Sequence, residues 1–320
     1  MAMKDLSIHL SRRAFVIGGA SAAALSQVAL WPTSVQAANI VDSLRNAAGS
    51  SDIVTHKVRG TISVLEGSGG NIGVFVGKDE KVLVDAGITA SRARISESLR
   101  ALGSQPVKQL INTHWHFDHT DGNEWIHSEG AAITAHTNTR RHLLEAQRVA
   151  DWNFTFPASP SGAVPAAVVD RDSVLDIDGG SVAITVYEPA HTDSDLSVHF
   201  VNENVVHVGD IFWNGLYPFI DYSTGGNIDG TIAAAARVIA ASDADTVIIP
   251  GHGNPLGTLD QLKHYHEMLA TIRDNVARMK SAGKSVEESV ALKPTEAFDD
   301  QWGKAIISPA FFTRLVYQGV

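Results

Sequence analysis

The chain has 320 residues, of which 44% are hydrophobic and 19% are charged, a balance typical of a globular protein with ample apolar material for a core. It contains no cysteine, which excludes a disulfide scaffold, a thiolate metal site and a cysteine nucleophile. The net charge of −10 repels phosphate backbones, so we expect no nucleic-acid partner.

The first 37 residues have the features of an export signal. Arg12 and Arg13 precede a mostly apolar run that is short for a membrane span, and small residues surround a possible cleavage point near Ala37. The motif Ser-Arg-Arg-x-Phe resembles a bacterial twin-arginine signal. We therefore predict a signal peptide over 1–37, a mature domain over 38–320, no stable membrane insertion after cleavage, and a periplasmic or secreted location. An ordinary secretory signal or an uncleaved anchor is the alternative.

After the signal, short strands separated by glycines are predicted over 52–67, 71–77 and 81–87. A helix over 89–102 and a strand over 107–113 follow, then a strand over 131–136, a helix over 137–150 and a proline-containing loop to 169. The second half predicts strands over 173–178, 182–188, 196–201, 205–209 and 246–249, and helices over 228–241, 258–281 and 310–318. This order of elements favours sheets covered by outer helices over a purely parallel, doubly wound sheet.

The segment NTHWHFDHTDGN, residues 112–123, concentrates ionisable side chains at the end of a predicted strand. In an extended segment alternate residues share a side, so His114, His116 and Asp118 can converge while the two aromatic residues between them anchor the core. His119 follows where the chain must turn. Converging imidazoles and a carboxylate are what a divalent transition metal needs. A loop of hydrogen-bonded histidines is the alternative, and four ligand-type residues in H-x-H-x-D-H argue against it.

This spacing resembles that of the metallo-β-lactamase-fold hydrolases, whose remaining ligands follow later strands. The counterparts here are His191 in EPAHTDSD, Asp210 in VVHVGDIFW and His252 in VIIPGHG. Asp85 in VLVDAG matches the buried aspartate that braces the metal loop in that family. One departure is Ala190, where the family often has glycine. The resemblance runs from about residue 55 to 280 and implies an α/β fold, a four-layer αββα sandwich.

The resemblance also implies two metal ions, zinc with iron or manganese as alternatives, and a water shared between them that attacks the substrate. The implied ligands are His114, His116 and His191 for the first ion, Asp118, His119 and His252 for the second, and Asp210 between them. Asp118 would also orient the attacking water, and Asp85 would fix the loop through hydrogen bonds.

The aromatic segment 211–222 directly follows Asp210. It packs either into the core or along a substrate pocket, where Tyr217 would donate a hydrogen bond to an oxyanion. The remaining histidines have no companion motif, so we interpret them as structural or surface residues.

Together these features predict an exported hydrolase that cleaves an ester, lactone, amide or thioester bond of a small molecule, with its oligomeric state left open. Hydrolysis of β-lactams is the first alternative, although Asp210 argues against it as the main activity. A phosphodiesterase is disfavoured because no lysine or arginine cluster accompanies the metal motifs. A diiron oxidoreductase of the same fold generally has Glu where this chain has His116, and a complete ligand set disfavours a non-catalytic metal-binding module.

Overall fold

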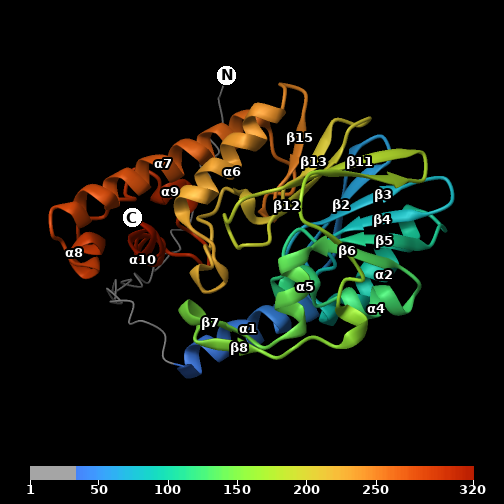
Figure 1. Ribbon diagram of the computed structural model, residues 1–320, viewed down its shortest axis with the longest axis horizontal. Helices are drawn as coiled ribbons and strands as arrows, with labels where there is room; N and C mark the ends of the chain where they lie inside the picture. The colour runs from blue at the N-terminus through green and yellow to red at the C-terminus, as the bar shows by residue number, and fades with distance from the viewer. Residues whose placement is uncertain (1–33) are drawn as a thin grey trace, which may run out of the picture. The chain divides into compact units, whose positions relative to one another are not determined.

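Two β-sheets form the centre of the described part of the chain, residues 34–320 of this computed structural model (Figure 1). The first sheet has the order β1-β2-β3-β4-β5-β6-β9, antiparallel from β1 to β4 and parallel from β4 to β9. Its strands are β1 (Val54–Arg59), β2 (Ile62–Glu66), β3 (Ile72–Val76), β4 (Lys81–Val84), β5 (Val107–Ile111), β6 (Ala132–His136) and β9 (Ala167–Val169).

The second sheet has the order β10-β11-β12-β13-β15 and is antiparallel except for the parallel pair of β13 and β15. Its strands are β10 (Ser173–Ile177), β11 (Gly180–Val186), β12 (Leu196–Phe200), β13 (Val205–His207) and β15 (Val247–Ile249). The sheets pack face to face through one apolar cluster, in which Phe75 of β3 stacks on Phe200 of β12 with ring centroids 5.9 Å apart. Burial of such apolar surface stabilises the sandwich.

Helices cover the outer face of each sheet (Figure 1). On the first sheet, α2 (Arg92–Leu102) and α4 (Asn123–Ser128) share an apolar cluster with Leu83 and Leu110. On the second, α6 (Ile228–Ala241) and α7 (Leu259–Ser281) pack in a cluster that includes Val206 and Ile248. The helical spacing of their apolar residues produces these buried faces. The predicted αββα sandwich is confirmed.

Several boundaries differ from the sequence prediction. The first predicted strand is a hairpin, because Gly60 adopts φ +54 and turns the chain between β1 and β2. The predicted helix over 137–150 ends early as α5 (Thr137–Leu144). The chain then forms η2 (Ala150–Trp152) between β7 (Gln147–Val149) and β8 (Phe154–Phe156), which pair antiparallel. Valine and phenylalanine in these short strands favour sheet pairing over a continued helix.

The helices at the two ends of the described chain were mostly not predicted. They are α1 (Ser34–Ser50), α8 (Val286–Ala291) and α9 (Asp299–Trp302), whereas the closing helix α10 (Pro309–Gly319) was expected. The predicted signal peptide lies outside the described residues apart from its last four positions, which belong to α1. None of the helices within residues 34–320 combines the length and apolarity needed to cross a bilayer.

Candidate metal centre

The histidine-rich motif begins just after β5 ends at Ile111. His114 and His116 lie in the connecting segment, and α3 (Phe117–Thr120) starts immediately afterwards. The prediction that the segment stays extended through Asp118 is therefore wrong. Asp118 and His119 lie in the single turn of α3, where successive side chains diverge by about 100°. For this reason Asp118 faces a different set of partners from His114 and His116.

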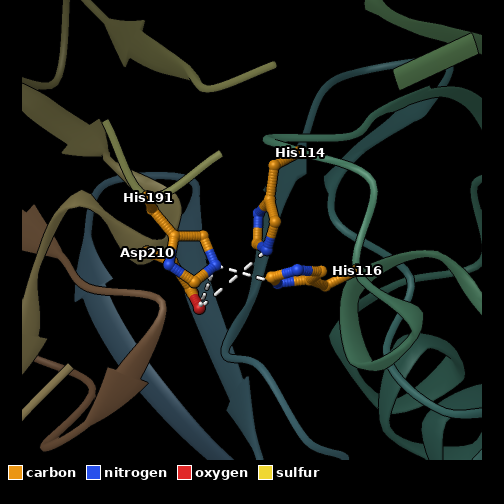
Figure 2. Close-up of side chains that lie close together, drawn as sticks. All are labelled: His114, His116, His191 and Asp210. Carbon is orange, nitrogen blue, oxygen red and sulfur yellow. Dashed lines mark hydrogen bonds and ion pairs between the residues drawn. The ribbon is translucent and has the colours of Figure 1, made fainter. Parts of the chain in front are cut away.

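The three other predicted ligands lie after or at the start of strands. His191 follows β11, Asp210 lies in η4 (Gly209–Ile211) after β13, and His252 begins the short strand β16 (His252–Gly253), which pairs with β14 (Trp213–Asn214). The structure gathers the seven predicted ligands into two adjoining groups, which are His114, His116, His191 and Asp210, and then Asp118, His119 and His252. Figure 2 shows the first group converging from two sides of the fold.

The Asp210 carboxylate joins the two groups. Its Oδ1 lies 3.1 Å from His119 Nε2, and its Oδ2 lies 3.3 Å from both His191 Nε2 and His252 Nε2. His114 Nε2 is 3.9 Å from the same Oδ2. One buried anion therefore contacts imidazoles from both groups, which is the position predicted for a bridging ligand.

Hydrogen-bond acceptors next to the outward-facing nitrogen of each ring determine which nitrogen of the histidine carries the proton. His116 Nε2 lies 3.0 Å from Asp221 Oδ2, His119 Nδ1 lies 2.8 Å from Asp85 Oδ2, and His191 Nδ1 lies 2.8 Å from the carbonyl of Phe219. Ionised carboxylates and carbonyls only accept hydrogen bonds, so these nitrogens donate. The opposite nitrogens, which face the cluster, consequently carry lone pairs.

The same reasoning applies to His114. The Thr113 hydroxyl donates its single proton to Asp85 Oδ2 at 2.8 Å, so it accepts from His114 Nδ1 at 3.0 Å. His114 Nε2 is then an acceptor, and within the described chain this buried atom has no hydrogen-bond partner. Asp85 also accepts from the Thr113 amide at 2.7 Å and adopts φ +66, a conformation uncommon outside glycine. Asp85 thus links Thr113 and His119 through its carboxylate.

Acceptors thus face acceptors at hydrogen-bond distance. His116 Nδ1 and His191 Nε2, both acceptors, are 2.9 Å apart, and the acceptor His119 Nε2 lies 3.2 Å from His252 Nε2, where a proton on His252 can join the two rings. Lone pairs at such separations repel unless a cation lies between them. A proton or a metal ion between the two nitrogens removes this repulsion. A buried set of imidazoles and carboxylates without thiolates is suited to zinc, iron or manganese. The residues present therefore fit a divalent metal.

The charges of the metal-free cluster show how protons occupy it. Burial disfavours a charged ring, but Asp210 and Asp118 outweigh it and raise the pKa of His252 to about 9. In His191, burial dominates and lowers the pKa to about 4. Burial would raise the pKa of Asp118, but the neighbouring His119 and His252 lower it to about 2. The cluster therefore holds protons mainly in the group of Asp118, His119 and His252.

Two glycines allow the backbone to approach the cluster closely. A Cβ atom on Gly251 would lie 1.9 Å from Asp210 Oδ1, and one on Gly70 would lie 2.3 Å from His119 Cε1. Atoms that are not bonded to each other cannot come this close without overlapping. These positions accept only glycine while Asp210 and His119 keep their places.

The structure does not bring Tyr217 to the cluster. Its hydroxyl lies 2.9 Å from Asp299 Oδ1 and 3.3 Å from the carbonyl of Thr295, and its ring stacks on Phe312. Since both oxygens accept, the single hydroxyl proton points into the C-terminal segment. The prediction of Tyr217 as an oxyanion donor is wrong, because the polar segment after α8 supplies its partner.

Asp221 is the main residue that the sequence analysis missed. Its carboxylate is fully buried, accepts from His116, from Thr224 Oγ1 at 2.7 Å and from the Ser223 amide at 2.9 Å, and its own amide donates to the carbonyl of His191. No spacing rule pairs it with a histidine 105 residues away. The only available signal was a carboxylate ending an otherwise aromatic segment.

Comparison with known proteins gives a family match and several similar folds. Residues 65–252 match the family model described as the metallo-beta-lactamase superfamily. The stereoselective inverting sec-alkylsulfatase Pisa1 from Pseudomonas sp. is 16% identical with a TM-score of 0.62, over 84% of this chain and 50% of that one. This chain therefore spans about half the length of the alkylsulfatase.

Two metallo-beta-lactamases match over almost their whole length. DIM-1 is 21% identical with a TM-score of 0.55, over 69% of this chain and 98% of the enzyme. The metallo-beta-lactamase from Pontibacter korlensis is 18% identical with a TM-score of 0.54, over 68% of this chain and 99% of the enzyme. At these identities the likeness shows a shared fold.

Proposed function

Because the chain belongs to the metallo-beta-lactamase superfamily and is a hydrolase of that superfamily, we propose that it uses two divalent metal ions to cleave an ester, lactone, amide or thioester bond. Zinc is the metal we expect first, with iron or manganese as alternatives. The observation that carries this proposal is the gathering of five imidazoles around the buried Asp210 carboxylate, with the lone pairs of His116 and His191 facing each other at 2.9 Å. Such a set is costly to bury without cations.

We assign the first ion to His114, His116 and His191, and the second to Asp118, His119 and His252, with Asp210 shared. Two such ions supply Lewis acidity toward a carbonyl oxygen and lower the pKa of a water molecule shared between them. The protein contributes the fixed orientation of the ligands, through Asp85, Asp221 and the Phe219 carbonyl.

We assign to Asp118 the role of orienting the attacking water. Its side chain is 13% exposed and that of His252 is 15% exposed, while the other ligands are almost fully buried. Substrate and water therefore reach the cluster from the edge formed by Asp118 and His252. With its pKa lowered to about 2, Asp118 is ionised at neutral pH and can accept a hydrogen bond from water at its carboxylate.

The charge around the cluster favours an uncharged acyl substrate. Within residues 34–320, the ion pairs of Asp118 and Asp210 are made with histidines alone. A phosphodiester or a sulfate ester carries a charge that enzymes commonly anchor with arginine or lysine. Lactones, thioesters and neutral esters need no such anchor, and β-lactams are the second candidate because the chain resembles two metallo-beta-lactamases in fold.

A substrate panel on the zinc-loaded protein tests this proposal. The panel contains lactones, thioesters, p-nitrophenyl esters, β-lactams, bis-(p-nitrophenyl) phosphate and a secondary alkyl sulfate. We expect the highest kcat/KM among the neutral acyl substrates, and no turnover after chelation. Preferential turnover of the phosphate or the sulfate would contradict the acyl assignment, and undiminished activity after complete metal removal would contradict the metal mechanism.

We also propose that the protein acts outside the cytoplasm, because Arg12 and Arg13 precede an apolar run in the predicted signal. Replacing both with lysine should leave the precursor in the cytoplasm, as followed by fractionation and immunoblotting. Export of the lysine variant at the normal rate would point to the general secretory route.

A further inference from the structure

A cavity of about 350 Å³ lies on the reverse side of the metal loop. None of the seven candidate ligands lines it, but Trp115 and Phe117, which alternate in sequence with His114 and His116, do. This volume falls within the range of small-molecule sites. The cavity is therefore separate from the candidate metal centre and shares one wall with it.

The wall is a continuous row of rings. Phe117 stacks on Phe156 with centroids 5.3 Å apart, and Phe156 meets Trp115 edge-on at 5.8 Å. Arg45 of α1 lies over Phe117 at 5.4 Å, and His142 of α5 lies 5.5 Å from Trp115. An apolar surface thus extends between a guanidinium at one end and an imidazole at the other.

The Arg45 end can bind an anion. Within residues 34–320 the half-buried guanidinium makes no hydrogen bond and no ion pair, and its only contact of note is with the Phe117 ring. Its five N–H donors are arranged in a planar fork that matches a carboxylate. Two acidic residues also line the cavity, but Asp121 accepts from the Thr89 amide at 2.8 Å and Glu124 is solvent-exposed. Arg45 is the one arginine or lysine among the described residues that line the cavity, and it lies directly against the aromatic wall.

The His142 end can bind a hydrogen-bond donor. Its side chain is only 7% exposed, and its Nε2 lies 2.6 Å from Asp193 Oδ1. The other oxygen of this carboxylate, Asp193 Oδ2, accepts from Arg141 at 2.7 Å, so the pair of contacts is that of an acceptor group and His142 Nε2 donates to Oδ1. His142 Nδ1 then carries a lone pair, and in the described chain it has no hydrogen-bond partner.

We infer that this cavity binds an amphipathic monocarboxylate. The carboxylate pairs with Arg45, the aromatic or aliphatic body lies along Phe117, Phe156 and Trp115, and a hydroxyl or amide N–H at the far end donates to His142 Nδ1. This binding does not depend on hydrolysis or on the identity of the metals, so the proposed function and this site can fail independently.

Isothermal titration calorimetry with 4-hydroxyphenylacetate tests the inference on the full chain, both zinc-loaded and metal-stripped. We expect one saturable site in both forms, with a Kd of about 1 mM or tighter. Two analogues separate the ends of the site. Phenylacetate, which lacks the hydroxyl, and 4-hydroxyphenylacetamide, which lacks the charge, should each bind about tenfold more weakly. Absence of saturable binding, or binding that requires zinc and so belongs to the metal centre, would overturn the inference.

Arg45→Met keeps the side-chain stem on Phe117 and removes the charge. It should weaken 4-hydroxyphenylacetate binding about tenfold and leave the amide analogue unaffected. The matched control is Arg92→Met, because Arg92 lies over the Trp125 ring at the same 5.4 Å but outside the cavity. Equal affinities in Arg45→Met and Arg92→Met, with both variants folded by circular dichroism, would refute the role of Arg45.

Discussion

Replacing Asp221 with asparagine should weaken metal binding without removing a ligand. Asp221 Oδ2 accepts from His116 Nε2 at 3.0 Å and from Thr224 Oγ1 at 2.7 Å, while Oδ1 accepts from the Ser223 amide at 2.9 Å. An asparagine has only one acceptor oxygen. If that oxygen keeps the Ser223 contact, its NH2 group faces His116 and shifts the proton to Nδ1, the nitrogen that should hold the metal.

The size of the effect follows from these contacts. A hydrogen bond to a charged group contributes about 1.5–3 kcal/mol, and losing such a partner of a metal-bound histidine typically costs about 10–100-fold in metal affinity. We expect Asp221→Asn to bind zinc about 10–100-fold more weakly than the wild type at neutral pH. The backbone contact from the Asp221 amide to the His191 carbonyl, at 2.9 Å, is retained and should keep the loop in place.

Zinc titrations in competition with a chromophoric chelator measure this affinity. Asp195→Asn is the matched control, because Asp195 is also a buried aspartate but, within residues 34–320, its carboxylate accepts only from Thr192, at 2.9 and 2.8 Å. Burial raises the pKa of Asp195 to about 7, so an uncharged asparagine is a close substitute. Wild-type zinc affinity in Asp221→Asn, with the ring protons of His116 unchanged by NMR, would refute the proposed tautomer.

Three further predictions concern neighbouring features. Gly251→Ala should bind less metal and have a lower melting temperature, because its Cβ would lie 1.9 Å from Asp210 Oδ1. Gly49→Ala is the control: the nearest atom to its added Cβ is 3.6 Å away, so its melting temperature should equal that of the wild type. In the metal-free protein His252 has its pKa raised to about 9, so its charged form stabilises the fold below its ordinary pKa of 6.5, and that contribution is lost as the pH rises through about 9. Zinc needs the neutral ring, so its apparent affinity should rise up to that pH and then level off in chelator titrations. Tyr217→Phe should reduce the free energy of unfolding by about 1 kcal/mol, seen as a slightly lower melting temperature, and leave kcat within about twofold of the wild type. A large fall in kcat would instead restore a catalytic role for the hydroxyl.

The order of the predicted elements favoured sheets covered by outer helices, whereas the αββα architecture and the full set of seven candidate ligands came from the resemblance to the metallo-β-lactamase fold. Strand ends followed by His191, Asp210 and His252 could be recognised one motif at a time, and Asp85 directly follows β4. Glycine-punctuated strands and helical spacing located most elements. Errors arose where two conformations suit the same residues, as at 147–156, where β7 and β8 replace the end of a predicted helix.

Contacts distant in sequence could not be predicted in this way. Asp221 contacts His116 across 105 residues, and Tyr217 finds Asp299 across 82. Aromatic residues near a metal motif suggest a pocket wall, yet only packing decides that Tyr217 turns toward the C-terminal segment. Likewise, the turn of α3 separates Asp118 from His116, because a four-residue helix gives no periodic signal in sequence.

The most direct test of the metal centre is anomalous diffraction from zinc-loaded crystals, recorded on both sides of the zinc absorption edge. We predict two anomalous peaks per chain, one among His114, His116 and His191 and the other among Asp118, His119 and His252, with Asp210 in contact with both. A single peak, or peaks away from these residues, would contradict the assignment of a two-metal site.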